Sequence, residues 1–325
     1  MQRLFTRAFF MQQEKYVMFS NRLTKVSRHL SKQAKRQHIT CYRIYDHDLP
    51  EFPFCIDRYE NKLSVAEYKR KFEMAGAEHE KWLNECLGIM SLVLQVPEED
   101  IYIRERQRKT SRLDQYGKIG EEKEYFVADE GGLKFKVNLS DYLDTGLFTD
   151  HRITRQMVKE QSKDKKVLNL FCYTGSFSVY AAAGGANETV SIDLSNTYLD
   201  WAKDNLQLNN LYDPAMHHFI KADVLQYLPK LPDTYFDLAI LDPPTFSNSK
   251  MMKDFLDIQR DHVKLINDTL RTLGKGGVLY FSTNYTKFVM DEEKIKASVI
   301  KDITKATTPF DFEGRLKRYC FMIIK

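Results

Sequence analysis

The chain from residue 166 onward alternates short apolar runs with longer stretches of helical character. The apolar runs lie at residues 166–171, 189–193, 218–222, 236–241 and 278–282, and we expect a further strand at 318–324. A repeated order of strand, helix and strand, with helices of ten or more residues, is typical of parallel strand pairing with right-handed crossovers. The pattern therefore predicts an α/β domain built on a doubly wound, Rossmann-like sheet.

Residues 40–139 show a different pattern of short strands, interrupted by one helix at about 75–96. Alternation such as LKFKV at 133–137 indicates half-exposed antiparallel strands, which favours a smaller α+β domain. A chain of 325 residues is long enough for two cores. We therefore expect a helical N-terminal segment at 1–39, a small α+β domain at 40–140 and the doubly wound domain at 141–325.

The turn after the first strand of the doubly wound domain is poor in glycine. A dinucleotide-binding enzyme would place Gly-x-Gly-x-x-Gly here, so that backbone amides approach a pyrophosphate. This turn instead reads Phe171, Cys172, Tyr173, Thr174 and Gly175. Tyr173 and Phe177 fill the room that a pyrophosphate would need, which predicts a nucleoside ligand without phosphates. The glycine-poor turn also makes a nicotinamide oxidoreductase the least favoured enzyme class.

Three predicted strands end in a carboxylate: Asp193, which Leu194 follows, then Asp223 and Asp242. In a doubly wound sheet, ligands bind beyond the carboxyl ends of the strands, where the strand order reverses. A crevice with these acids repels phosphate and attracts a cation. S-adenosylmethionine carries a sulfonium, an ammonium, a ribose diol and an adenine amine, all complementary to acids. The alternative is that each aspartate merely caps the following helix.

The stretch LDPPTFSNSK at 241–250 follows a buried strand. Two prolines remove amide donors and keep the backbone extended, so that neighbouring carbonyls point outward as fixed acceptors. Phe246 adds a flat face on which a planar base can stack, which contributes about 1–3 kcal/mol. We therefore expect Asp242, Pro243 and Phe246 to hold a target base, the alternative being a stiff loop with an aromatic plug.

Together these features resemble the class I S-adenosylmethionine-dependent methyltransferases. More narrowly, the chain resembles the C-terminal half of the bifunctional bacterial 23S rRNA methyltransferase, the half that methylates guanine N7. The likeness runs from about residue 19 to the C-terminus. It includes CYRIYD at 41–46, RERQ at 104–107, DYLDTGLFTDHR at 141–152 and DIQRDH at 257–262. The family's N-terminal half, with an RNA-binding module, is not in this sequence, so we expect that a separate protein supplies it.

The resemblance implies methyl transfer to guanine N7 of large-subunit rRNA. Related cytosine-C5 methyltransferases use a nucleophilic cysteine after the fifth strand, where this chain has Thr283 and Asn284. Guanine N7 carries a lone pair and no proton, so no general base is needed. Two alternatives stay open: methylation of an exocyclic amine (guanine N2 or adenine N6), and a catalytically silent RNA-binding protein on the same fold.

RNA contacts are expected from two basic segments. Residues 22–36 predict an amphipathic helix whose outer face carries Arg22, Lys25, Arg28, Lys32 and Lys35, and a second basic stretch contains Arg106, Arg108, Lys109 and Arg112. A solvated face is the alternative for either. The formal net charge is only +4, so any RNA contact depends on such local clustering.

The segment at 144–152 joins the two domains and could close over the cofactor, with Phe148 beside its methionine moiety and Arg152 facing its carboxylate. The expected cofactor-binding residues are thus Phe148, Arg152, Phe171, Tyr173, Thr174, Gly175, Asp193, Leu194, Asp223 and Asp242. The eight histidines complete no metal motif, so we expect no metal. Five cysteines without a Cys-x-x-Cys pair and no apolar run of about 18 residues favour a soluble, cytoplasmic protein.

Overall fold

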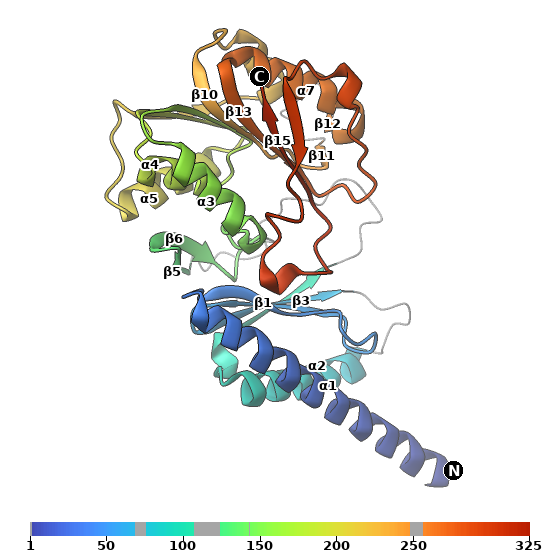
Figure 1. The fold of residues 1–325 in the computed structure, drawn as a ribbon. Helices are drawn as coiled ribbons and strands as arrows, with labels where there is room; N and C mark the ends of the chain where they lie inside the picture. Colours follow the sequence, from blue (N-terminus) through green and yellow to red (C-terminus); the bar gives the residue numbers. More distant parts are fainter. Residues whose placement is uncertain (1, 69–75, 107–123, 143, 248–255) are drawn as a thin grey trace.

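The computed structural model describes residues 2–68, 76–106, 124–142, 144–247 and 256–325. Its chain forms two parts, each built around its own sheet (Figure 1). The N-terminal part contains α1 (Gln2–Arg36), β1 (Cys41–Asp46), β2 (Phe54–Tyr59), β3 (Lys62–Tyr68), α2 (Gly76–Leu94), η1 (Glu98–Asp100) and β4 (Ile101–Arg106). Its sheet has the order β1-β2-β3-β4, antiparallel except for the parallel pair β3 and β4.

Helix α1 belongs to the same core as this sheet. Its apolar residues Phe19, Leu23, Val26 and Leu30 are buried in one cluster with strand residues and with Trp82 of α2. Both helices cover the face of the sheet that is turned away from the C-terminal part (Figure 1). The expected boundary between residues 39 and 40 therefore falls inside one hydrophobic core. The apolar face of α1 is buried against the sheet that follows it in the chain.

The hairpin of β5 (Tyr125–Glu130) and β6 (Leu133–Asn138) packs mainly on the C-terminal part. Phe135 and Val137 share a core cluster with Tyr180 of α4 and Leu206 of α5. Asn205 on α5 also accepts a hydrogen bond from the Lys136 amide, at 2.8 Å. By packing, residues 124–140 thus go with the doubly wound domain rather than with the α+β domain, so the expected boundary at 140/141 falls too late in the chain.

The C-terminal part contains a seven-stranded sheet with the order β14-β15-β13-β10-β7-β8-β9. Its strands are β7 (Lys166–Leu170), β8 (Glu188–Asp193), β9 (His217–Lys221), β10 (Phe236–Leu241), β13 (Leu273–Thr283), β14 (Val299–Asp302) and β15 (Tyr319–Ile324). Five of them run parallel, and β15 pairs antiparallel with both β13 and β14. The chain builds outward from β7 to β9 and then returns to β10, so the strand order reverses between β7 and β10. The predicted doubly wound fold is confirmed.

Helices cover both faces of this sheet. Helices α3 (Arg152–Gln161), α4 (Ser176–Ala183) and α5 (Asn196–Leu208) gather on one side, and α7 (Ile258–Thr272) lies on the other (Figure 1). The shorter elements are η2 (Thr149–His151), α6 (Val224–Tyr227), η3 (Leu228–Lys230), β11 (Phe246–Ser247), β12 (Leu256–Asp257), η4 (Glu292–Lys294) and η5 (Phe310–Phe312). Within the described residues, no helix combines the length and apolarity needed to cross a membrane.

Candidate active site at the strand ends

The loop between β7 and α4 has a constrained backbone. Phe171 and Tyr173 have φ of 57° and 51°, a left-handed conformation that costs about 1–3 kcal/mol for residues other than glycine. Gly175 has a φ of 71°, and a Cβ at this position would lie 2.5 Å from Cβ of Ala202 on α5. Such strain persists only where surrounding structure imposes it, and it clusters at ligand sites. The single glycine of this turn is therefore required by the approach of α5.

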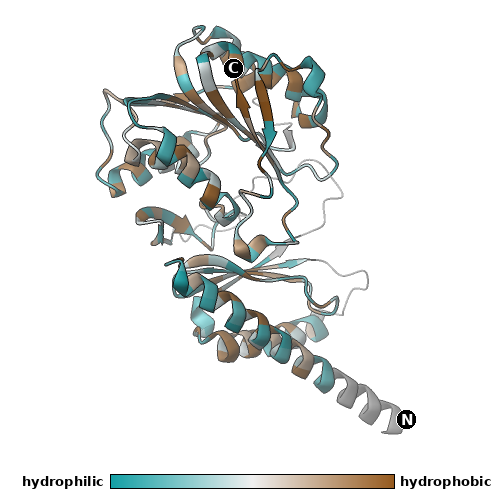
Figure 2. Cartoon of the chain, viewed as in Figure 1, coloured by the Kyte–Doolittle hydropathy of each residue, from teal (hydrophilic) through white to brown (hydrophobic). Residues whose placement is uncertain are grey.

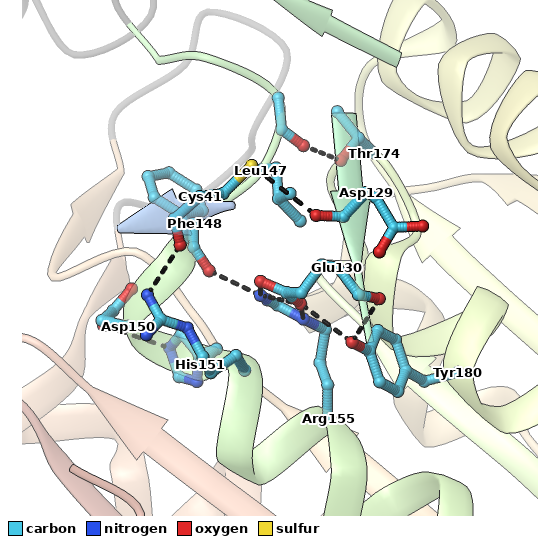
Figure 3. Close-up of polar contacts among 12 residues, drawn as sticks. Cys41, Asp129, Glu130, Leu147, Phe148, Asp150, His151, Arg155, Thr174 and Tyr180 are labelled. Carbon is cyan, nitrogen blue, oxygen red and sulfur yellow. Dashed lines mark hydrogen bonds and ion pairs between the residues drawn. The ribbon is translucent and has the colours of Figure 1, made fainter. Parts of the chain in front are cut away.

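Thr174 fixes this loop to the segment that joins the two parts. Its buried hydroxyl donates to the Gly146 carbonyl at 2.5 Å (Figure 3), and its own carbonyl accepts from Asn205 at 2.9 Å. The hydroxyl and the carbonyl of Thr174 are thus engaged within the protein. We assign the side chain of Thr174 to positioning the loop.

Asp193 lies at the end of β8 and turns its carboxylate toward the same loop. Its two oxygens accept hydrogen bonds from the Tyr173 amide at 3.0 Å and from the Ser195 amide at 2.9 Å. Burial raises the pKa of Asp193, although the backbone hydrogen bonds from Ser195, Tyr173 and Leu194 oppose the shift. Each carboxylate oxygen keeps a second lone pair for a further donor. The carboxylate therefore holds the loop and can also accept from ligand hydroxyls.

Asp223 caps α6, because its Oδ1 accepts from the Leu225 amide at 3.0 Å. The alternative of a helix cap is thus correct for one oxygen. The other, Oδ2, is buried and has no hydrogen-bond partner among the described residues. A buried acceptor without a partner costs about 1–3 kcal/mol, and a ligand amine would remove that cost. The geometry fits an amine donor such as that of adenine.

Asp242 lies after β10, beside the strand-order reversal. Its Oδ1 accepts from the Ser282 hydroxyl of β13 at 2.5 Å, and about a third of its side chain is exposed. Pro243 is buried, and the Thr245 hydroxyl donates to Asn284, which links this loop to the end of β13. The backbone of Phe246 pairs with Asp257 in the short ladder β11–β12. The Phe246 ring lies outside the described side chains.

His151 is a site residue that the sequence reasoning missed. It is 6% exposed, and its Nε2 lies 3.5 Å from Asp242 Oδ2 and 3.9 Å from Asp150 Oδ2. Its ring packs edge-on against Phe177 of α4. His151 lies in the segment DYLDTGLFTDHR, which carries the family resemblance, but we considered histidines only as metal ligands.

Arg152 does not face the cofactor crevice. Its guanidinium forms a buried, two-pronged ion pair with Asp311 at 2.8 and 2.9 Å, and it also donates to the Cys41 carbonyl at 3.0 Å. Asp311 in turn accepts from the Arg43 amide at 2.8 Å. These groups form the junction between the two parts of the chain. The expected role of Arg152 at the cofactor carboxylate is therefore replaced by a structural role here.

Phe148 is 44% exposed, and its ring lies 5.3 Å from that of Tyr173, centroid to centroid. A buried cluster fixes its backbone: Arg155 donates to the Phe148 carbonyl at 2.8 Å and pairs with both oxygens of Glu130 (Figure 3). The Tyr180 hydroxyl also donates to Glu130. The hairpin, α3 and α4 thus hold Phe148 at the loop after β7, and its place beside the cofactor stays a prediction.

The predicted basic face of α1 is formed. Lys25, Arg28, Lys32 and Lys35 are exposed, and the viewer-facing side of α1 is largely hydrophilic (Figure 2). Arg22 is only partly exposed and pairs with Asp48 at 2.7 Å, so part of its charge is used within the fold. In the second basic segment, Arg106 ends β4 with its side chain not described, and Arg108, Lys109 and Arg112 lie outside the described residues.

Within the described part of the chain, His151 is the one basic side chain within ion-pair distance of these strand-end acids. Among the described side chains, no lysine or arginine lies within ion-pair distance of Asp193, Asp223 or Asp242. The described residues also contain no group of three or more His, Cys, Asp or Glu side chains that could hold a metal ion. The crevice is thus acidic, which fits a cationic nucleoside and disfavours a phosphate.

The comparison with sequences identifies the family of this chain. A family profile for S-adenosylmethionine-dependent methyltransferases matches residues 98–313. The chain is 48% identical over 307 residues to ribosomal RNA large subunit methyltransferase K of Neisseria meningitidis serogroup B, covering 94% of this chain and 86% of that relative. It is 44% identical over 297 residues to the K/L methyltransferase of Magnetococcus marinus, covering 91% of this chain but 41% of that relative. The chain spans less than half of such K/L relatives.

Solved structures give the same result for the fold. A methyltransferase solved as a complex with SAH (S-adenosylhomocysteine) has a TM-score of 0.71 at 25% identity, covering 94% of this chain and 82% of that one. A SAM-dependent methyltransferase from Streptococcus mutans has a TM-score of 0.70 at 24% identity, with coverage of 94% and 81%. Both likenesses extend over the N-terminal part as well as the doubly wound sheet.

Proposed function

Because the chain belongs to the S-adenosylmethionine-dependent methyltransferase family, we propose that it methylates N7 of a guanine in 23S rRNA. The cofactor is that of the family, and the sequence resembles the C-terminal half of the bifunctional 23S rRNA enzyme. The relatives of Neisseria meningitidis and Magnetococcus marinus are named as large-subunit rRNA methyltransferases, which supports rRNA as the substrate. The preference for N7 rests on the family resemblance.

The proposal assigns the cofactor to the crevice between β7, β8 and β10. S-adenosylmethionine supplies an electrophilic methyl group on a positively charged sulfur. In this proposal Asp193 accepts from the ribose hydroxyls, Asp223 Oδ2 accepts from the adenine amine, and Phe148 covers the site from the joining segment. The buried oxygen of Asp223 without a partner is the observation that most favours a nucleoside here.

The target base is proposed to lie at the loop of Asp242 and Pro243. N7 of guanine needs alignment rather than deprotonation, and alignment alone can lower a bimolecular barrier by several kcal/mol. Asp242, fixed by Ser282, orients the base and offsets the positive charge that guanine gains on methylation. The major groove of A-form RNA is too deep and narrow for side chains to reach, so the guanine must be unpaired or extruded.

Covalent catalysis by a cysteine finds no support in the site. Cys320 lies inside β15, and burial raises the pKa of its thiol to about 11, so the thiolate is scarce at neutral pH. All five cysteines are buried, and none of them forms a disulfide. This favours a nitrogen target over C5 of cytosine. Free thiols also fit the cytoplasm, where we place this activity.

RNA capture is proposed for the basic face of α1 and for the basic stretch that includes Arg106, Arg108, Lys109 and Arg112. We also propose that a separate protein supplies further RNA contacts. Adding candidate partners to the methylation reaction tests this. A partner that supplies such contacts lowers the KM for RNA and leaves the affinity for S-adenosylmethionine unchanged.

Nucleoside mass spectrometry tests the proposed reaction directly. Unmodified 23S rRNA is incubated with the purified chain and S-adenosylmethionine, and the expected product is 7-methylguanosine. N2-methylguanosine or N6-methyladenosine would instead identify the exocyclic-amine alternative, and the absence of any methylated nucleoside would favour a silent RNA-binding protein. Asp242→Asn should lower kcat by about 100-fold, as for loss of one electrostatic stabiliser. Full turnover with normal substrate affinity would refute the role of Asp242.

A further inference from the structure

His151 occupies a position between the domain junction and the proposed base site. It belongs to η2, immediately before Arg152, yet its Nε2 lies 3.5 Å from Asp242 Oδ2. The side chain is 6% exposed and packs edge-on against Phe177, with ring centroids 5.6 Å apart. A buried imidazole aimed at a half-buried carboxylate of the site is not explained by core packing alone.

Charged groups face His151 from several elements. Asp150 precedes it in η2, Arg155 lies on α3, Arg318 comes just before β15 and Asp242 follows β10. Arg318 is itself held in place, because it donates to the Asp150 carbonyl at 2.9 Å. Burial, reinforced by Arg318 and Arg155, lowers the pKa of His151 to about 4, although Asp150 and Asp242 oppose the shift. At neutral pH the imidazole is uncharged and carries one N–H.

We propose that His151 is a positioning residue that holds Asp242 by donating a hydrogen bond from Nε2 as a neutral imidazole. This rests on the proposed function of Asp242. The Ser282 hydroxyl binds one carboxylate oxygen and His151 faces the other, so the two donors together fix the plane of the carboxylate. The present 3.5 Å separation is long, as catalytic hydrogen bonds often are before substrate binds.

Neutrality is essential to this role. An imidazolium beside Asp242 would cancel the negative charge that is meant to offset the charge on a methylated guanine. A neutral donor orients the carboxylate and leaves its charge available to the substrate. His151 stays neutral next to two aspartates because it is buried and because two arginines lie nearby.

Two substitutions separate hydrogen bonding from packing. His151→Phe keeps a ring against Phe177 but removes the N–H, whereas His151→Gln returns a donor close to the position of Nε2. We expect His151→Phe to lower kcat about 10- to 100-fold with the Kd for S-adenosylmethionine within about twofold of wild type, as for loss of one orienting group. We expect His151→Gln to recover most of that loss. His217→Phe, at a buried histidine of β9 bonded to Thr189, is the matched control.

Rates are expressed relative to wild type for whichever methylated nucleoside the wild type makes. A product other than 7-methylguanosine would therefore refute the proposed function while leaving the test of His151 intact. Wild-type kcat with His151→Phe, or a glutamine variant as slow as the phenylalanine variant, would overturn the proposed hydrogen bond.

The tautomer of His151 gives a second readout, measured on the wild-type protein, that does not depend on the phenylalanine variant folding. Histidine-selective ¹⁵N NMR of the wild-type protein should show a neutral Nε2–H tautomer at pH 7, with the signal assigned by its loss in His151→Gln. If the phenylalanine variant fails to fold, this measurement decides the proposal. A neutral Nδ1–H tautomer or an imidazolium at pH 7 would overturn it.

Discussion

Carboxylates that support the fold and carboxylates at the strand ends have opposite surroundings. Asp311 in the domain junction faces Arg152, and Glu130 of the hairpin faces Arg155 of α3, each through two short contacts. At the strand ends, Asp193 and Asp223 are bound only by backbone amides among the described residues. The first kind of carboxylate is matched by a charge within the protein, and the second kind has no such charge among the described side chains. This difference is the reason that we propose the second kind for the cofactor.

The largest expected effect is on stability, in the junction. Asp311→Leu leaves the Arg152 guanidinium buried without its partner, and arginine cannot give up its charge. We expect the free energy of unfolding to fall by about 3–5 kcal/mol, the range measured when one partner of a buried pair is removed. Urea denaturation measures this change. A double variant, Asp311→Leu with Arg152→Met, should recover much of the loss, and a single variant as stable as wild type would remove the distinction between the two regions.

A smaller effect should appear as pH dependence of cofactor binding. Burial raises the pKa of Asp193, so its carboxylate takes up a proton at a higher pH than an ordinary aspartate. Ribose hydroxyls donate to the charged form, and the affinity for S-adenosylmethionine should therefore be constant near neutral pH and fall as the pH drops through this raised pKa. Calorimetry between pH 7.5 and 4.5 measures the change, and Asp193→Asn should abolish it.

Asp193→Asn should affect stability much less than Asp311→Leu, because among the described side chains no buried cation pairs with Asp193; burial raises the pKa of both carboxylates, so the pKa direction does not distinguish them. A raised folded-state pKa means that the ionised carboxylate costs folding free energy once the pH rises above that pKa, while below it the neutral form carries no such cost. Asp193→Asn should therefore not lower the free energy of unfolding at pH 7 by more than about 1 kcal/mol, since one backbone hydrogen bond is the most it forfeits. A large loss of stability would place Asp193 with the structural carboxylates.

The smallest effect is expected for RNA binding at α1, because the basic side chains of its outer face are exposed to solvent. Replacing Lys25, Arg28, Lys32 and Lys35 with glutamine should flatten the dependence of RNA affinity on salt by about 0.7 per lost phosphate contact on single-stranded RNA. Fluorescence anisotropy at several salt concentrations measures the slope. Neutralising exposed Lys301 and Lys305 is the control, and an equal change in both variants would indicate unspecific charge.

Features that depend on residues close together in the sequence were predicted correctly. The strands of the doubly wound sheet, the strand ends at Asp193, Asp223 and Asp242, and the amphipathic character of α1 follow from periodicity, and all are present. The assignment of hairpin residues 124–140 failed because alternation identifies a strand but not the helix that it packs against. Here that helix is α5, through Asn205 and Leu206.

Long-range pairing was beyond the sequence. Arg152 pairs with Asp311, which lies 159 residues further along the chain, and no local feature distinguishes that arginine from one that binds a ligand. His151 and its neighbour Asp242 come from different elements, so their approach depends on how η2 settles against the end of β10. His151 and Arg152 lie next to each other in the same motif, and the fold turns Arg152 toward the junction and His151 toward Asp242.

Calorimetric titration of S-adenosylmethionine into wild type, Asp193→Asn and Asp200→Asn tests most directly whether carboxylates without charge partners bind the cofactor. Asp200 lies exposed on the helix that follows Asp193 and controls for a change of one charge. The account predicts a roughly 10- to 150-fold weaker Kd for Asp193→Asn, the loss of a hydrogen bond to a charged group, and a wild-type Kd for Asp200→Asn. Equal affinity of all three proteins for the methyl donor would contradict it.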